Sequence, residues 1–152
     1  MELGRVITPE AVREALDLAR DEFFAENDPA GEDAAKFMAA TEYAAFSGRI
    51  LAGNCVIWAC RDGGRLRGML ALEDARDILL FFVARDYRRH GIGRALVAAA
   101  CEYAQEAERT ELRAAVPESC EAFFLRLGFE RKGGVCERGG IRGADMRFDV
   151  TL

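Results

Sequence analysis

The sequence predicts one domain of the α/β or α+β class with a mixed sheet, and three observations support this prediction. The chain has 152 residues, of which 51% are apolar, and a chain of this length buries roughly 68–70% of its unfolded surface, enough for one core. Helical periodicity dominates residues 9–46, whereas short apolar and alternating runs begin at Cys55. Residues 78–83 (ILLFFV) are apolar on both faces, as expected for a central strand covered on both sides. This order of elements is typical of layered α/β folds.

Two helices are predicted in the N-terminal part. Thr8 is expected to cap the first, with Pro9 at its first position and the Glu10 carboxylate near the positive end of the helix dipole. The apolar residues that follow recur at helical spacing: Val12, Leu16, Ala19 and Phe23. A second helix is predicted over residues 32–46, after a break at residues 29–31.

The remainder of the chain predicts mainly strands. Residues 55–60 and 66–72 are expected to pair across the turn signal Asp62-Gly63-Gly64. The elements expected after them are a strand (78–83), a basic glycine-bearing loop (85–93), a helix (91–107), a strand (111–116), a short helix (120–127) and two further extended stretches.

Composition excludes several classes of protein. A net charge of -5 argues against binding to a nucleic-acid backbone, which depends on Lys and Arg. The longest unbroken apolar runs, such as residues 78–84, are far shorter than the roughly 20 residues that span a membrane, and we expect no secretion signal. The 5 cysteines lack metal-site or redox spacing and there is 1 histidine, so we expect reduced thiols, no metal and a cytoplasmic location.

The segment with the clearest chemical implication joins the buried strand to the next helix. Its loop reads RRHGIG at residues 88–93 and runs directly into that helix. The first turn of a helix has backbone N–H groups without intrahelical partners, and the helix dipole adds positive charge there. The absence of side chains at Gly91 and Gly93 lets a pyrophosphate approach the backbone, while Arg88, Arg89 and Arg94 supply countercharge. The sequence therefore predicts an anion site.

This loop has two other interpretations. A strand-to-helix turn with a solvated basic face would have the same residues. The nucleotide-binding patterns GxGxxG and GxxxxGK[ST] both fail against RRHGIGRAL at residues 88–96, which makes nucleotide hydrolysis a remote alternative.

Residues 78–99 resemble the acyl-CoA-binding core of the GNAT-type N-acetyltransferase superfamily, whose pattern is [Gln/Arg]-x-x-Gly-x-[Gly/Ala] between the fourth strand and third helix. FFLRLGFERKG at residues 123–133 resembles the family's FYxxxGF signature, and GIRGADMRF at residues 140–148 resembles its last strand. The resemblance implies one GNAT-like domain over residues 1–152. Its sheet would be mixed, mostly antiparallel, splayed at the fourth strand and flanked by about four helices.

The resemblance also implies how acetyl-CoA binds. The pantetheine arm would pair like an added strand with the main chain of Phe81, Phe82 and Val83. The residues that would surround the pyrophosphate are Arg88, Arg89, His90, Gly91, Ile92 and Gly93, with Arg94 close enough to help. Phe124 occupies the position where the family commonly has a tyrosine that protonates the leaving thiolate, and a phenyl ring cannot donate a proton.

The function expected from the resemblance is N-acetyl transfer. An acetyl group would move from acetyl-CoA to a primary amine of a small molecule, peptide or protein, by direct attack in a ternary complex and without a metal. Asp77 is the predicted general base, with Glu111 and Glu73 as rivals, and Cys120 is an alternative proton donor or acyl carrier. The alternative function, suggested by Phe124, is a weak or inactive CoA-binding sensor or interaction module. We expect a monomer or homodimer whose partners are acetyl-CoA and an amine.

Overall fold

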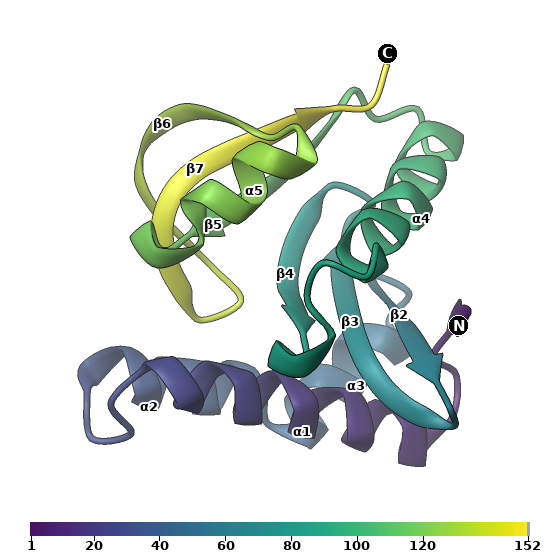
Figure 1. Cartoon of the computed structure of the whole chain (residues 1–152), viewed down its shortest axis with the longest axis vertical. Coiled ribbons are helices and arrows are strands. Elements are labelled where there is room, and N and C mark those ends of the chain that lie inside the picture. Colours follow the sequence, from purple (N-terminus) through teal and green to yellow (C-terminus); the bar gives the residue numbers. More distant parts are fainter. Residues whose placement is uncertain (152) are drawn as a thin grey trace.

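The computed structural model describes residues 1–151, which form a single seven-stranded sheet with helices on both faces (Figure 1). The sheet order is β1-β2-β3-β4-β5-β7-β6. Its strands are β1 (Glu2–Arg5), β2 (Cys55–Asp62), β3 (Arg65–Glu73), β4 (Asp77–Val83), β5 (Glu111–Val116), β6 (Glu130–Arg138) and β7 (Ile141–Asp149). The helices are α1 (Pro9–Glu26), α2 (Glu32–Ala40), α3 (Tyr43–Leu51), α4 (Ile92–Glu106) and α5 (Glu121–Leu127), with 3-10 turns η1 (Arg85–Tyr87) and η2 (Glu118–Cys120). The predicted α/β class is confirmed.

The sheet separates between β4 and β5. These strands run parallel and are in register at Asp77 with Arg113 and at Ile78 with Ala114. Every other strand pair in residues 1–151 is antiparallel. β4 therefore keeps its pairing with β3 along its length but leaves β5 after its first two residues, which confirms the predicted splay at the fourth strand.

Two apolar cores cover the two faces of the sheet. α1, α2 and α3 pack on one face through buried residues such as Phe23, Phe37 and Phe46. α4 and α5 pack on the other, and they lie in the upper half of Figure 1 while α1 and α2 run along its bottom. α4 approaches β3 closely, since a Cβ on Gly68 would lie 2.7 Å from the Ile92 side chain. The central strand β4 contributes residues to both cores, as its apolar sequence predicts.

The predicted helix over residues 32–46 is wrong in its extent, because two helices occupy that region. α2 ends at Ala40, where Thr41 has a non-helical conformation and its hydroxyl donates a hydrogen bond to the Phe37 carbonyl over 2.7 Å. The Arg20 guanidinium donates to the Thr41 carbonyl at 2.8 Å. The bond from Arg20 takes the place of the helical bond that the Thr41 carbonyl would otherwise accept, so the chain turns at Glu42 before α3 begins. In residues 1–151, five helices therefore flank the sheet, compared with the prediction of about four.

β1 and the two N-terminal hairpin strands complete one edge of the sheet. The short, exposed β1 was not predicted, and it pairs antiparallel with β2. β2 and β3 pair as predicted across the Gly63-Gly64 turn, where both glycines have positive φ angles of 61° and 78°. β1 has only four residues, which are too few to show the alternation that predicts a strand.

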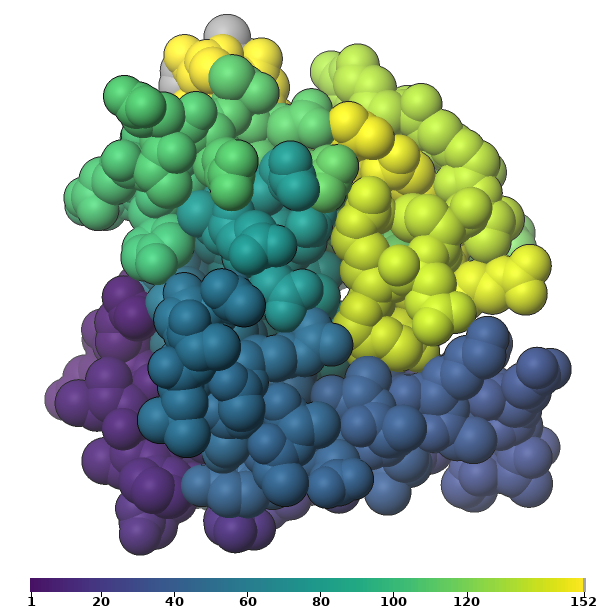
Figure 2. Space-filling model, turned by 180° about the vertical axis from the view of Figure 1, so that it is seen from behind, coloured from purple at the N-terminus to yellow at the C-terminus, as the bar shows by residue number. Residues whose placement is uncertain are grey.

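The tip of the β6–β7 hairpin connects the two halves of the molecule. Figure 2, seen from behind, shows this hairpin in yellow-green against α2 in blue. Gly139 has a φ angle of 61°, and a Cβ there would lie 2.3 Å from the Leu79 carbonyl oxygen of β4. On the α2 side, Lys36 pairs with Glu137 at 3.3 Å. Because a side chain at Gly139 would collide with β4, glycine allows the hairpin to sit against that strand.

The cysteines are all free thiols. Across residues 1–151, no cluster of three or more His, Cys, Asp or Glu side chains is arranged to hold a metal ion. Over the same residues, no helix has the length and apolar character needed to cross a membrane.

Candidate functional site

A cavity of about 750 Å³ fills the space where β4 and β5 separate. This volume lies within the range of small-molecule and cofactor sites. Its walls come from α1, β4, the loop before α4, the end of β5 and α5. The residues that line it include Glu22, Phe23, Glu26, Asn27, Ile78, Leu79, Phe81, Phe82, Val83, Arg88, Arg89, Gly91, Gly93, Arg94, Ser119, Cys120, Phe123, Phe124 and Ile141.

β4 presents an unpaired edge to this cavity. Phe81, Phe82 and Val83 pair with β3 on one side, whereas the pairing of β4 with β5 stops at Ile78. All three residues line the cavity. An extended ligand can bind such an edge through main-chain hydrogen bonds, as in β-strand addition.

The start of α4 forms the second wall. Gly91 precedes α4 in a left-handed conformation with φ of 82°, and no side chain in residues 1–151 caps the helix there. Arg89 also has a positive φ, 67°, which is uncommon for a residue with a side chain. Arg88, Arg89 and Arg94 all line the cavity beside the uncapped N–H groups. Cationic side chains and helix N–H groups together make this wall suited to an anion.

Two of the predicted loop residues lie outside the cavity lining. His90 is exposed, and its ring Nδ1 lies 3.0 Å from the carbonyl oxygen of Arg88. Ile92 is 1% exposed and packs toward Gly68 in the core under α4. The side chains of His90 and Ile92 are thus not part of the cavity wall.

Phe124 forms part of an aromatic cluster on the α5 side. Its ring is 5.6 Å from Phe81 and 5.0 Å from Phe129, both in edge-to-face arrangements. Cys120 and Ser119 also line the cavity, and their side chains lie 3.8 Å apart. Burial raises the pKa of the Cys120 thiol, so this group stays protonated at neutral pH.

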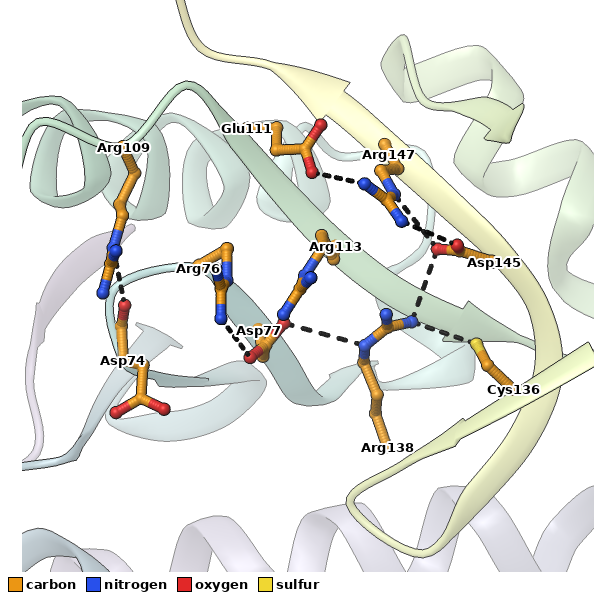
Figure 3. A network of polar contacts seen from close by, with 10 residues as sticks. All are labelled: Asp74, Arg76, Asp77, Arg109, Glu111, Arg113, Cys136, Arg138, Asp145 and Arg147. Atoms are coloured by element: carbon orange, nitrogen blue, oxygen red, sulfur yellow. Dashed lines mark hydrogen bonds and ion pairs between the residues drawn. The ribbon is translucent and has the colours of Figure 1, made fainter. Parts of the chain in front are cut away.

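Asp77 lies at the closed end of the splay, and its neighbours Ile78 and Leu79 line the cavity while Asp77 does not. Its carboxylate accepts a hydrogen bond from Arg113 Nε at 2.7 Å. Arg138 and Arg76 lie 3.7 Å away, as Figure 3 shows. The predicted base is thus held among three guanidinium groups.

The ion network around Asp77 continues into β7 (Figure 3). Arg138 pairs with Asp145 at 3.5 Å, and Arg147 donates to Asp145 at 2.9 Å and to Glu111 at 2.6 Å. The hydrogen bond from Arg147 lowers the pKa of Asp145 below its ordinary value. The rival bases are therefore also in ion pairs, Glu111 with Arg147 and Glu73 with Arg49, the latter at 2.6 Å.

α1 supplies carboxylates that the sequence reasoning missed. Glu22 is 8% exposed and Glu26 lies one turn later, and both line the cavity. Burial raises the pKa of Glu22, although Arg85 and Arg88 oppose this effect. A signal was available in the sequence, since Glu22 falls on the helical stripe that continues from Val12 to Ala19. Glutamate at a position with core periodicity is uncommon unless the carboxylate has a partner.

Comparison with known structures identifies the fold. A GCN5-related N-acetyltransferase from Rhodopseudomonas palustris is 19% identical, with 97% of this chain and 94% of that chain covered and a TM-score of 0.75. PaiA N-acetyltransferase from Thermoplasma acidophilum, in complex with coenzyme A, is 13% identical, with 98% and 99% covered and a TM-score of 0.77. An aminoglycoside 6'-N-acetyltransferase complexed with coenzyme A is 14% identical, with 100% and 98% covered and a TM-score of 0.67.

No curated protein has a significantly similar sequence. The family described as the acetyltransferase (GNAT) domain matches residues 25–150, which include β2 to β7, the loop before α4 and the whole cavity wall formed by α5. The chain therefore belongs to the GNAT acetyltransferase family.

Proposed function

We propose that this GNAT acyltransferase moves an acetyl group from acetyl-CoA to a primary amine of a small molecule, peptide or protein. One observation carries the proposal: a single cavity joins the unpaired edge of β4 to the arginine-lined start of α4. Pantetheine would bind along Phe81, Phe82 and Val83, and the pyrophosphate at residues 88–94. Two of the similar structures contain coenzyme A, which supports this assignment.

The proposed reaction is direct attack in a ternary complex. A neutral amine adds to the thioester carbon, and main-chain N–H groups of β4 stabilise the charge that develops on the carbonyl oxygen. The C–S bond then breaks, the acetyl group stays on nitrogen, and the proton lost by the amine balances the one gained by the CoA thiolate. Much of the acceleration would come from holding the two reactants in line within the cavity.

Proton transfer is the part of this mechanism in which one residue, Phe124, departs from the family pattern. Asp77 is the proposed base, and because it lies outside the cavity lining, the amine proton would reach it through water. Phe124 offers no proton for the thiolate, so we propose the protonated Cys120 thiol as the donor. We further propose that residues 1–152 form one domain, that the protein is cytoplasmic, and that it is a monomer or homodimer.

A second candidate function is favoured by Phe124. A protein that binds CoA but transfers acetyl groups weakly or not at all would serve as a sensor or interaction module. The observation that favours it is the phenyl ring of Phe124 at the usual position of the proton donor. The ring packs against Phe81 and Phe129 and carries no hydroxyl group.

Calorimetric titration with acetyl-CoA and with CoA tests the proposal, together with free-thiol release over pooled primary amines. Binding with thiol release establishes the transferase. Binding without thiol release over the panel favours the sensor. Absence of binding contradicts the assignment of the loop and cavity to CoA.

A further inference from the structure

The feature that the proposed reaction leaves unused is the buried carboxylate of Glu22. It lies in the apolar stripe of α1, is 8% exposed and lines the cavity. Its Oε1 is fully shielded from solvent and accepts no hydrogen bond from any residue that the structure describes. Burying an ionised carboxylate without hydrogen bonds is costly, so a group of this kind needs a cation.

The nearest cations belong to the loop after β4. Oε1 of Glu22 lies 3.6 Å from Arg85 Nε and 3.7 Å from Arg88 Nη2. The other terminal nitrogen of Arg88, Nη1, lies 3.6 Å from Glu26 Oε1. Arg88 is therefore shared between two carboxylates one turn apart on α1, and it touches neither at hydrogen-bond distance.

Arg88 cannot serve these carboxylates and an anion equally well at the same time. It is the first arginine of the loop that the proposed function assigns to the pyrophosphate, and charge-assisted bonds to phosphate are short and strong. When the guanidinium turns toward phosphate, Glu22 keeps only Arg85, at 3.6 Å, and Glu26 loses the one cation that it pairs with in residues 1–151. The cavity then contains an anionic ligand beside two carboxylates, which favours entry of a new positive charge.

We propose that Glu22 and Glu26 bind a second, positively charged group of the acceptor once acetyl-CoA has taken Arg88. This inference rests on the proposed function and adds a substrate class to it: amines with a further cationic group, such as aliphatic diamines. The cation cannot be the reacting amine itself, because that nitrogen must be neutral to attack the thioester. Binding of the cofactor and of the cationic group should also reinforce each other, since coupling between two sites is reciprocal.

The experiment compares 1,4-diaminobutane with n-butylamine, which has the same chain length but no second amine. Thiol release from acetyl-CoA gives kcat/KM for each, and calorimetry gives the Kd of CoA with and without 10 mM of either amine, a concentration on the order of those used for weak ligands. The variant is Glu22→Gln/Glu26→Gln. The matched control is Asp17→Asn/Asp21→Asn, which removes the same charge at the same spacing from the exposed face of α1.

For the wild type we expect kcat/KM to favour the diamine by about tenfold, and the diamine alone to tighten CoA binding by about fivefold. In the Glu22→Gln/Glu26→Gln variant both differences should fall to less than twofold. CoA alone should bind this variant about fivefold more tightly than it binds wild type, because Arg88 is no longer held by α1. The control variant should behave as wild type does, and thermal melts verify that both variants are folded.

Three results would overturn the inference. One is equal tightening of CoA by the two amines in the wild type. Another is a variant that loses activity equally with both acceptors, as expected if Glu22 only accepted a proton. The third is weaker or unchanged CoA binding by the variant. A wild type that binds no CoA would instead refute the proposed function, so the two failures are distinguishable.

Discussion

Two ionic clusters flank the splayed strands, and they are built in opposite ways. At the closed end, Asp77 bonds Arg113 at 2.7 Å and Asp145 bonds Arg147 at 2.9 Å. In the cavity, the separations from Glu22 to Arg85 and Arg88 are 3.6 and 3.7 Å, and Oε1 has no hydrogen bond within residues 1–151. The pKa directions follow this contrast, since the pKa of Asp145 is lowered and that of Glu22 is raised.

The difference teaches which charges hold the fold and which are free to exchange partners. Hydrogen-bonded pairs at the closed end connect β4, β5 and β7 at the place where β4 and β5 still pair with each other. Breaking a hydrogen-bonded buried pair leaves a charge without compensation. The longer ion pairs around Arg88 lose little interaction energy when the guanidinium moves. A strong cluster therefore fixes the splay, and a weak one borders the proposed ligand site.

The largest effect is expected when the cation of the weak cluster, Arg88 between Glu22 and Glu26, is replaced by a negative charge. Arg88→Glu places a third carboxylate beside Glu22 and Glu26 and removes the proposed phosphate contact. We expect calorimetry to show CoA affinity lowered by about 100-fold, or about 2.7 kcal/mol. The matched control is Arg65→Glu at an exposed site on β3, which should change the affinity less than twofold. Retained affinity in Arg88→Glu would contradict the placement of the pyrophosphate.

Asp77→Asn tests whether the strong cluster also contributes to chemistry. If Asp77 is the base, kcat should fall by about 100-fold while the Kd of CoA stays the same, because general-base catalysis contributes about that much. Turnover that is unchanged from pH 6 to pH 9, a range on the order of three units around neutrality, would show that Asp77 serves the fold alone.

Arg113→Met tests the structural contribution of the same cluster. Asp77, with a side chain 15% exposed, would lose its hydrogen-bonded partner. We expect a loss of about 2 kcal/mol, which corresponds to roughly 4–8 °C in Tm for a chain of this size. Calorimetric unfolding measures this change. The double variant Arg113→Met/Asp77→Leu should recover part of it, since the carboxylate that lost its hydrogen-bonded partner is removed as well.

A smaller effect is expected from pH acting on the weak cluster. The groups that face Glu22 are Arg85, Arg88 and Glu26, with the Cys120 thiol close to the last two. Because the pKa of Glu22 is raised, its ionisation opposes folding, and this penalty is absent below its unfolded pKa and grows as pH rises through the folded value. Glu22→Gln should therefore raise Tm by about 1–3 °C at pH 8. The gain should vanish toward pH 4, below the ordinary glutamate pKa of about 4.3.

The smallest effect is expected at the opposite wall of the cavity. Cys120→Ala removes the proposed proton donor for the thiolate, and CoA thiolate can also be protonated by water. We expect kcat to fall by about threefold to tenfold without a change in the Kd of CoA. Cys101→Ala, at a partly buried thiol on α4, is the matched control and should leave kcat unchanged. An effect of equal size in both variants would assign the loss to packing.

The elements with a strong local pattern could be predicted from the sequence. Thr8 caps α1 through a hydrogen bond from the Ala11 N–H, and β5 has the predicted bounds of residues 111–116. The break between α2 and α3 could not be predicted, since it depends on Arg20 reaching Thr41 across 21 residues. β1 could not be predicted either, because its four residues are too few to show a period. Its pairing with β2 joins segments more than 50 residues apart.

The candidate site also has a part that the sequence could predict and a part that it could not. The loop at residues 88–94 is contiguous, so its glycines and arginines could be recognised together. Glu22 and Glu26 come from another element, and only folding brings them to Arg88. The position of Asp77 at the start of the central strand was predicted, whereas its partners Arg113 and Arg138 come from β5 and β6. Contacts between distant segments were therefore what the sequence pattern left open.

The tip of the β6–β7 hairpin ties the length of that hairpin to the shape of the cavity. Gly139 and Gly140 sit between β4 and α2, and Ile141 directly after them lines the cavity. β7 pairs with β5 as far as Ala144, close to the turn, so the tip has little freedom to shift. Because a Cβ at Gly139 would lie 2.3 Å from the Leu79 carbonyl oxygen, a bulkier turn would displace β4, whose edge is the proposed pantetheine site. The length of this turn is therefore constrained by the separation of β4 from β5.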